Sequence, residues 1–183
     1  EIQGGNLIVN GQIRRNTSTT NGILNYSQSG GVVTLNGNAA VAGYAKLEVL
    51  NASSVFNMSA GTITIVRGGG TTYGDLYLRP ASSSVTGGTI IFTNVIPNTF
   101  QNYSLDANTP LNNLTITGAA GAGLNASLGL IVSPLVLNGT LTLSNTQSIF
   151  SSNNVNVSIK GNLDNSGTFN YGTNTTTFNG GVQ

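Results

Sequence analysis

The sequence predicts an all-β protein with the fold of a parallel β-helix, or β-solenoid, of about seven coils of roughly 24–30 residues. The first observation is a short block, repeated along the chain, in which Gly or Asn is followed by apolar residues two and four positions later. Such alternation is typical of a strand with one buried face. The second is the period itself, which holds about three short strands and their turns. The third is a composition rich in Val, Ile and Thr, which favours folded β structure over disorder.

The copies of the block are expected to stack as strands of neighbouring coils. The first residue of each copy is called its anchor, and the seven anchors are Gly5, Gly31, Gly61, Gly88, Asn112, Gly139 and Gly167. Their numbers increase in steps of similar size along the whole chain. The outward positions of these strands form columns of Thr and Asn, whose like side chains we expect to hydrogen-bond along the axis.

Further strands are predicted between the anchors, at 47–49, at 76–78, around Ile131 and Leu135, and around Ile159 and Leu163. Pairs such as Asn36-Gly37 and Gly68-Gly69 are typical of the sharp turns between them.

Aligning the strand that begins at Leu47 with the one that begins at Leu76 places Lys46 and Asp75 in adjacent coils. We expect both side chains to point outward and to form an exposed ion pair, worth ~0 to 1 kcal/mol.

The composition argues against most catalytic and metal chemistry. The chain has no Cys, His or Trp, so neither a Ser/His/Asp triad nor a zinc site can be built from it. The acidic residues are too far apart in the sequence for a calcium loop, although distant carboxylates could still meet in a glycosidase site. They are Glu1, Glu48, Asp75, Asp106 and Asp164. We therefore expect no enzyme activity, no cofactor and no metal.

The charge argues against nucleic acid as a partner, because the formal net charge is only +1. Arg14 and Arg15, the only adjacent basic pair, indicate a solvated turn. The uncharged stretch 119–137 contains Asn125, Ser133 and Pro134, which divide it into pieces shorter than the ~20 apolar residues of a spanning helix. The segment is therefore not expected to be transmembrane.

Four segments resemble the very large repetitive cell-surface proteins of Bacteroidota, including adhesins of gliding bacteria exported by type IX secretion. They are 85–92, 111–116, 137–143 and 159–169. The resemblance implies a secreted, adhesive protein at the bacterial cell surface. It also implies the continuation of the same repetitive chain as a partner, with surface polysaccharide or other cell-surface or secretion components as further candidates.

The leading hypothesis is a structural or adhesive module, a stalk or adhesin repeat region whose ligand-binding residues the sequence leaves unknown. Residues 1–183 are expected to form a single solenoid segment of a longer chain, because neither end looks like a polar cap. One alternative is a carbohydrate-binding or polysaccharide-degrading β-helix. Its candidate residues are Asp75, Arg79, Arg67 and Glu48. Asp75 and Arg79 lie on either side of the predicted strand 76–78, and this spacing more commonly indicates a surface ion pair than a catalytic site.

A further alternative is an ice-binding solenoid, suggested by Thr-x-Thr triplets. These are 62–64, 115–117 and 140–142. The unequal steps between anchors argue against the flat lattice that ice binding requires.

Overall fold

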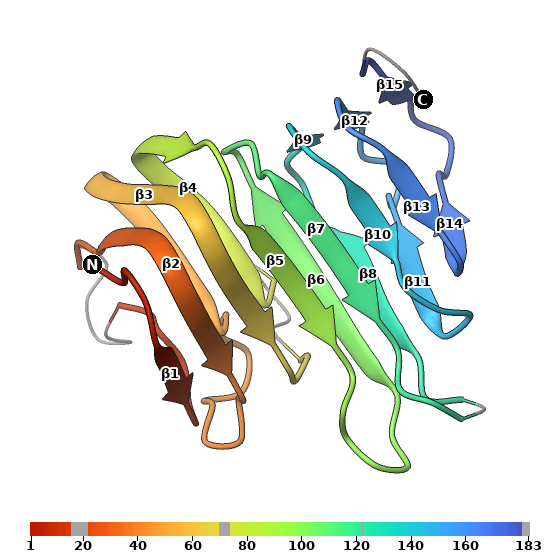
Figure 1. Ribbon diagram of the computed structural model, residues 1–183, viewed down its shortest axis with the longest axis horizontal. Helices are drawn as coiled ribbons and strands as arrows, with labels where there is room; N and C mark the ends of the chain where they lie inside the picture. The colour runs from red at the N-terminus through yellow and green to blue at the C-terminus, as the bar shows by residue number, and fades with distance from the viewer. Residues whose placement is uncertain (16–21, 70–73, 122, 181–183) are drawn as a thin grey trace.

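The structure, a computed structural model, is a parallel β-solenoid of about six turns (Figure 1). It describes residues 1–15, 22–69, 74–121 and 123–180, and these contain strands but no helix. Every strand pair is parallel, and the coils are stacked in chain order from the N-terminal to the C-terminal end. The predicted fold class is therefore confirmed. Each complete coil runs over three faces of the column.

The first face, called the anchor face, carries the strands of the repeated block. It consists of β1 (Asn6–Val9), the ends of β2 (Asn25–Leu35) and β3 (Leu47–Ile65), β5 (Thr89–Thr93), β7 (Asn113–Thr117), β10 (Leu141–Leu143) and β13 (Leu163–Asn165). The register follows the anchors for six coils, with Leu7, Val33, Ile63, Ile90, Leu114 and Leu141 in one column.

The second face begins with the first residues of β3 and of β4 (Leu76–Val85). It continues with β6 (Gln101–Ala107), β8 (Ala126–Leu130), β11 (Ser148–Ser151) and β14 (Thr168–Asn170). The predicted alignment of Leu47 with Leu76 is confirmed, and Leu105 follows in the same column.

The third face joins the other two. In the early coils it is formed by the first part of β2, the middle of β3 and the end of β4, which pair through Tyr26, Phe56 and Ser83. Later it consists of β9 (Leu135–Leu137), β12 (Val157–Ile159) and β15 (Thr176–Phe178).

The seventh anchor, Gly167, is a wrong prediction. Leu141 pairs with Leu163, so the next residue in the anchor column is Gly161, whose N–H donates to the carbonyl of Gly139. Phe169, two residues after Gly167, belongs to the second face and stacks on Phe150 with ring centroids 5.2 Å apart. The alternation after Gly167 is real, but alternation marks any strand with one buried face. The last coils are shorter than the earlier ones. A repeat of constant length therefore places the seventh anchor on the second face instead of the anchor face.

The core is a continuous column of apolar side chains inside the coils. In β7 and β10 the buried residues alternate strictly with half-buried outward ones. Large side chains such as Phe56, Phe92 and Phe150 are fully buried at different heights of the column. Each coil therefore rests on the coil below and supports the one above, which is the packing logic of a solenoid.

Glycine is required at the corner before the anchor face. Gly31, Gly61 and Gly88 have φ of 67°, 84° and 84°, values that side chains with a Cβ disfavour. The corners also stack closely, since a Cβ added to Gly61 would lie 2.6 Å from the Gly30 carbonyl oxygen. The buried side chain of Gln28 completes this corner, because its Nε2 donates to the carbonyls of Gly30, Gly31 and Thr62.

Asparagine side chains hold the turns of neighbouring coils together, which explains their abundance. Nδ2 of buried Asn94 donates to the carbonyl oxygens of Thr99, Leu124 and Asn125. Nδ2 of Asn145 donates to the Gly118 carbonyl of the previous coil at 2.8 Å. Carbonyl groups in a turn lack the N–H donors that a neighbouring strand supplies in a sheet, and the asparagine side-chain amides supply these donors instead.

The variation in coil length lies in the turns. The connection from the anchor face to the second face is longest near the N-terminal end, where it covers 36–46 between β2 and β3. It shrinks to 144–147 between β10 and β11 and to 166–167 between β13 and β14. No register shift interrupts the anchor face from β3 through β10. The coils therefore narrow toward the C-terminal end while this face keeps its register.

We expect Gly61→Ala to destabilise the protein strongly. Its left-handed backbone alone costs a residue with a Cβ about 1 to 3 kcal/mol, and the contacts with the Gly30 and Gly31 carbonyls add to this. The free energy of unfolding from denaturant titration measures the loss. Gly4→Ala is the matched control, because nothing lies within 4 Å of its added Cβ, and it should change stability by less than about 0.5 kcal/mol. Equal effects of the two changes would contradict the stacked corner.

Leu141→Ala should lower the free energy of unfolding by ~2 to 5 kcal/mol, because the Leu141 side chain is completely buried and its removal leaves a cavity in the core. Thr142→Ser on the outward side of the same strand should stay within ~0.5 kcal/mol. Calorimetry of both variants checks the assignment of the two sides, and a neutral Leu141→Ala would refute it.

Candidate functional site

Charged side chains gather on the outer side of the second face, at the beginning of β3 and β4 and at the end of β6. The three ion pairs of the described residues all lie here. They are Arg15 with Glu48, Lys46 with Asp75, and Arg79 with Asp106. The carboxylate of each pair is almost completely buried. This cluster is the richest concentration of chemically active groups in the described parts of the chain.

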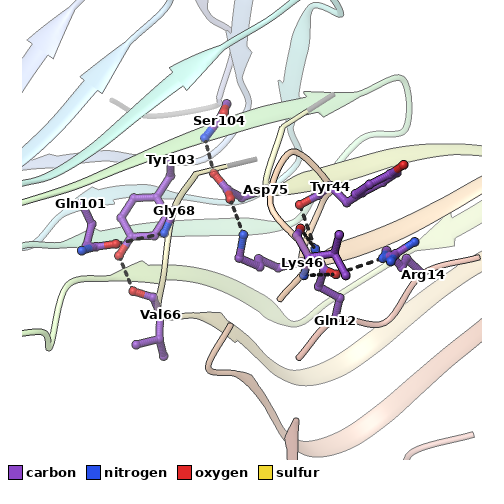
Figure 2. A network of polar contacts seen from close by, with 11 residues as sticks. Gln12, Arg14, Tyr44, Lys46, Val66, Gly68, Asp75, Gln101, Tyr103 and Ser104 are labelled. Atoms are coloured by element: carbon purple, nitrogen blue, oxygen red, sulfur yellow. Dashed lines mark hydrogen bonds and ion pairs between the residues drawn. The ribbon is translucent and has the colours of Figure 1, made fainter. Parts of the chain in front are cut away.

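The pair of Lys46 and Asp75 is buried rather than exposed. Nζ of Lys46 lies 3.3 Å from Oδ1 of Asp75, and the two side chains are 5% and 0% exposed (Figure 2). The other carboxylate oxygen of Asp75 accepts a hydrogen bond from the N–H of Ser104 in the next coil. The turn at Gly37 covers the lysine, because a Cβ added there would lie 2.9 Å from Lys46 Cε. The predicted contact is thus confirmed, but the predicted exposure is wrong.

The other two pairs flank Tyr77. Register places Glu48, Tyr77 and Asp106 in one column on three successive coils. Nη2 of Arg79 donates to Oδ2 of Asp106 at 2.8 Å, and the Arg79 guanidinium lies 5.7 Å from the centre of the Tyr77 ring. Nε of Arg15 lies 2.9 Å from Oε1 of Glu48, in a close ion pair that lacks the geometry of a hydrogen bond. Both guanidinium groups retain partial exposure, at 25% and 38% of their side chains.

The adjacent arginines do not form a joint basic patch. Arg14 turns toward the preceding polar turn, where its Nε donates to Oε1 of Gln12 and its guanidinium lies 4.4 Å from the centre of the Tyr44 ring (Figure 2). Gln12 in turn donates to the carbonyls of Val41 and Tyr44. Arg15 points to Glu48 instead. Each arginine therefore has a local structural partner.

Tyr103 joins the core to the turns next to this cluster. Its hydroxyl oxygen lies 2.8 Å from the carbonyl oxygens of both Val66 and Thr93, and its single proton is shared between these two acceptors. Figure 2 shows the contact with Val66. Burial raises the pKa of the Tyr103 hydroxyl far above its usual value, the nearby Asp75 carboxylate raises the pKa further, and Arg67 lowers it. The phenol thus stays protonated as a structural donor.

The residues proposed for a polysaccharide-degrading site do not converge. Asp75 pairs with Lys46, whereas Arg79 pairs with Asp106. Glu48 pairs with Arg15, and Nε of Arg67 donates to the side chain of Asn38. Each carboxylate of the cluster is thus occupied by a cation.

The described residues contain no group of three or more His, Cys, Asp or Glu side chains placed to hold a metal ion. They also contain no helix long and apolar enough to cross a membrane.

Sequence reasoning found one of the three ion pairs and missed the other two. The missed signal is the separation in sequence, because opposite charges one coil apart are a signature of pairing between coils. Arg79 and Asp106 are separated by the same step as the anchors Gly61 and Gly88. Arg15 and Glu48 are separated by more than any step between anchors, in line with the bridge that pairs Ile13 with Leu47.

Comparison with known proteins yields no relative, since no family model, curated protein or solved structure matches the chain. The resemblance of its repeats to surface proteins of Bacteroidota therefore stays a prediction.

Asp75→Asn should lower the free energy of unfolding by ~3 to 5 kcal/mol, because the buried Lys46 cation loses its counter-charge. The double change Lys46→Met with Asp75→Asn should recover most of this loss. It leaves no buried charge, and the asparagine oxygen still accepts the Ser104 N–H. Chemical denaturation of the wild type and the variants, Lys46→Met included, measures the coupling.

Asp106→Asn is the matched control, because Arg79 is 38% exposed and water can solvate it once unpaired. Its loss should be clearly smaller than that of Asp75→Asn. A double variant no more stable than Asp75→Asn alone would show that the Lys46 charge is not the cause.

Proposed function

We propose that this chain is a structural and adhesive module of a secreted bacterial cell-surface protein. In this role it forms a stiff segment of a stalk that extends from the cell and presents binding surface. Six turns at ~4.8 Å each give a segment roughly 30 Å long.

The observation that carries the proposal is the use of the charged residues. Glu48, Asp75 and Asp106 are spaced along the stack, each neutralised by a cation from a different coil or turn. A hydrolase or lyase requires carboxylates that converge and remain free to exchange protons. This arrangement instead ties coil to coil, which favours a mechanical role.

The proposed partner is the continuation of the same repetitive chain, because the repeats resemble those of very large cell-surface proteins. Parallel pairing of one coil on the next is the contact by which such a chain would continue.

The cell-surface location and type IX export rest on the repeats at 85–92, 111–116, 137–143 and 159–169 and their resemblance to Bacteroidota adhesins. Surface polysaccharides and other cell-surface or secretion components are the proposed targets of adhesion. The sparse charge favours uncharged polysaccharides among these targets, because few ions need to lose water on binding.

Stretching single molecules between their two ends tests the mechanical role. We expect the chain to unfold in successive steps that each release one coil or a few coils, because every coil rests only on its neighbours. One coil of roughly 27 residues extends by roughly 9 nm. The Asp75→Asn variant should lower the force of the steps that involve the coils of Lys46 and Asp75.

Extension of the whole chain without resisting force would contradict the stalk. Adhesion is read separately, from the retention under flow of beads that carry the chain on polysaccharide-coated glass. Retention equal to that of beads carrying an inert protein would contradict the adhesive half of the proposal for those surfaces.

A further inference from the structure

The outward side of the anchor face is neutral and rich in threonine. From β3 to β10 its outward positions carry hydroxyl, amide or aliphatic groups only. They are Thr62, Thr64, Thr89, Ile91, Thr93, Asn113, Thr115, Thr117, Thr140 and Thr142. The first charged residue in these columns is Asp164, on β13. The charged cluster of the protein lies on another face, so this neutrality is local.

These side chains form a regular two-dimensional array. Thr62 aligns with Thr89, and Thr64 aligns with Ile91, Thr115 and Thr142, with no register shift across four strands. Figure 1 shows β5, β7 and β10 side by side along the stack. The unequal steps between anchors predict an irregular surface. In the structure the difference in coil length lies in the turns, such as those between β2 and β3 and between β10 and β11. The objection therefore does not apply to this face.

Most of the hydroxyl groups remain available to an external ligand. The expected hydrogen bonds between outward side chains are largely absent, since among the described residues the structure has one here, from the Thr117 hydroxyl to that of Ser144. In addition, Oδ1 of Asn113 accepts the backbone N–H of Thr140 on the next coil. The hydroxyls of Thr64, Thr115 and Thr142 make no hydrogen bond to another described residue. The three residues are half-buried, so part of each side chain is accessible. The predicted ladder is wrong on this face, because equivalent positions on successive coils lie ~4.8 Å apart, farther than a hydrogen bond between two like hydroxyl groups spans.

The array has the repeat of a crystal surface. Threonines lie ~4.8 Å apart from coil to coil and ~6.6 Å apart along a strand, and each presents one methyl and one hydroxyl group. Four strands and three columns cover roughly 14 Å by 13 Å. Oxygen atoms on a prism face of ice repeat at distances of this size in two perpendicular directions, and the crystal is uncharged. A face without ions matches it, because no charge has to be dehydrated.

We propose that the anchor face between β3 and β10 is an ice-binding surface. Its threonine hydroxyls take positions in the hydrogen-bonded lattice, and its methyl groups order the water between them. The proposal goes beyond the stalk function and holds whether or not the chain bears force.

A neutral polysaccharide fits this face less well. Sugar rings commonly bind by stacking on aromatic side chains, whereas none of the outward positions of β5, β7 and β10 is aromatic. The aromatic residues Phe92 and Tyr103 point into the core. The face thus offers spaced hydroxyl and methyl groups but no stacking platform.

Ice-affinity partitioning and thermal hysteresis of the purified chain test the proposal. We expect the wild type to be enriched in a slowly growing ice shell, to hold back crystal growth below the melting point and to shape the crystals. Thr115→Tyr places a bulky side chain in the centre of the array and should remove most of the hysteresis. Ser84→Tyr, at an exposed outward position of β4 on the third face, is the matched control and should keep wild-type activity.

Thr115→Val keeps the shape of the side chain and removes only the hydroxyl group. It therefore replaces Thr115→Tyr as the test if the larger residue disturbs folding. We expect circular dichroism of the valine variant to match the wild type and its hysteresis to fall. Exclusion of the wild type from ice, like an inert protein of equal size, would overturn the proposal. Binding to insoluble cellulose or chitin that Thr115→Tyr abolishes, without effect on ice growth, would reassign the face to polysaccharide and equally overturn it.

Discussion

Backbone hydrogen bonding between successive coils is the constraint on which the rest of this structure depends. All strand pairs are parallel, and on the anchor face from β3 to β10 the register is unbroken, so each residue there lies ~4.8 Å from its equivalent one coil away. Apolar residues must therefore stack on apolar residues, as Ile63, Ile90 and Leu114 do. Corners must stack as well, which leaves no room for a Cβ at Gly61. The repeat in the sequence is the consequence of this spacing.

The same spacing decides where charges can be placed. Like charges at equivalent positions would repel one another, whereas opposite charges one coil apart attract. The protein has few charged residues, and six of them form the three pairs that connect coils or adjoining turns on the second face. Burial of Lys46 with Asp75 adds specificity to the stacking, since a slipped register would leave a buried ion without a partner.

The faces of the column differ in regularity. Turns after the anchor face vary in length and fold over the second face, where they bury Lys46 and carry Arg67 and Asn94. The anchor face keeps its register from β3 to β10 and stays open. A solenoid of this kind can thus vary one side for contacts between its own coils while another side remains an ordered surface for an external partner.

The amino-acid pattern was sufficient to establish the fold class, six of the anchors and the alignment of Leu47 with Leu76, because register and alternation are local properties that recur at every coil. What happens where the period changes depended on the folded chain. In the folded chain the last anchor is Gly161 and not the predicted Gly167, and Lys46 is buried beneath the turn at Gly37. Turn lengths and the segments that cover a face depend on contacts between residues far apart in the chain. A pattern within one coil carries no information about them.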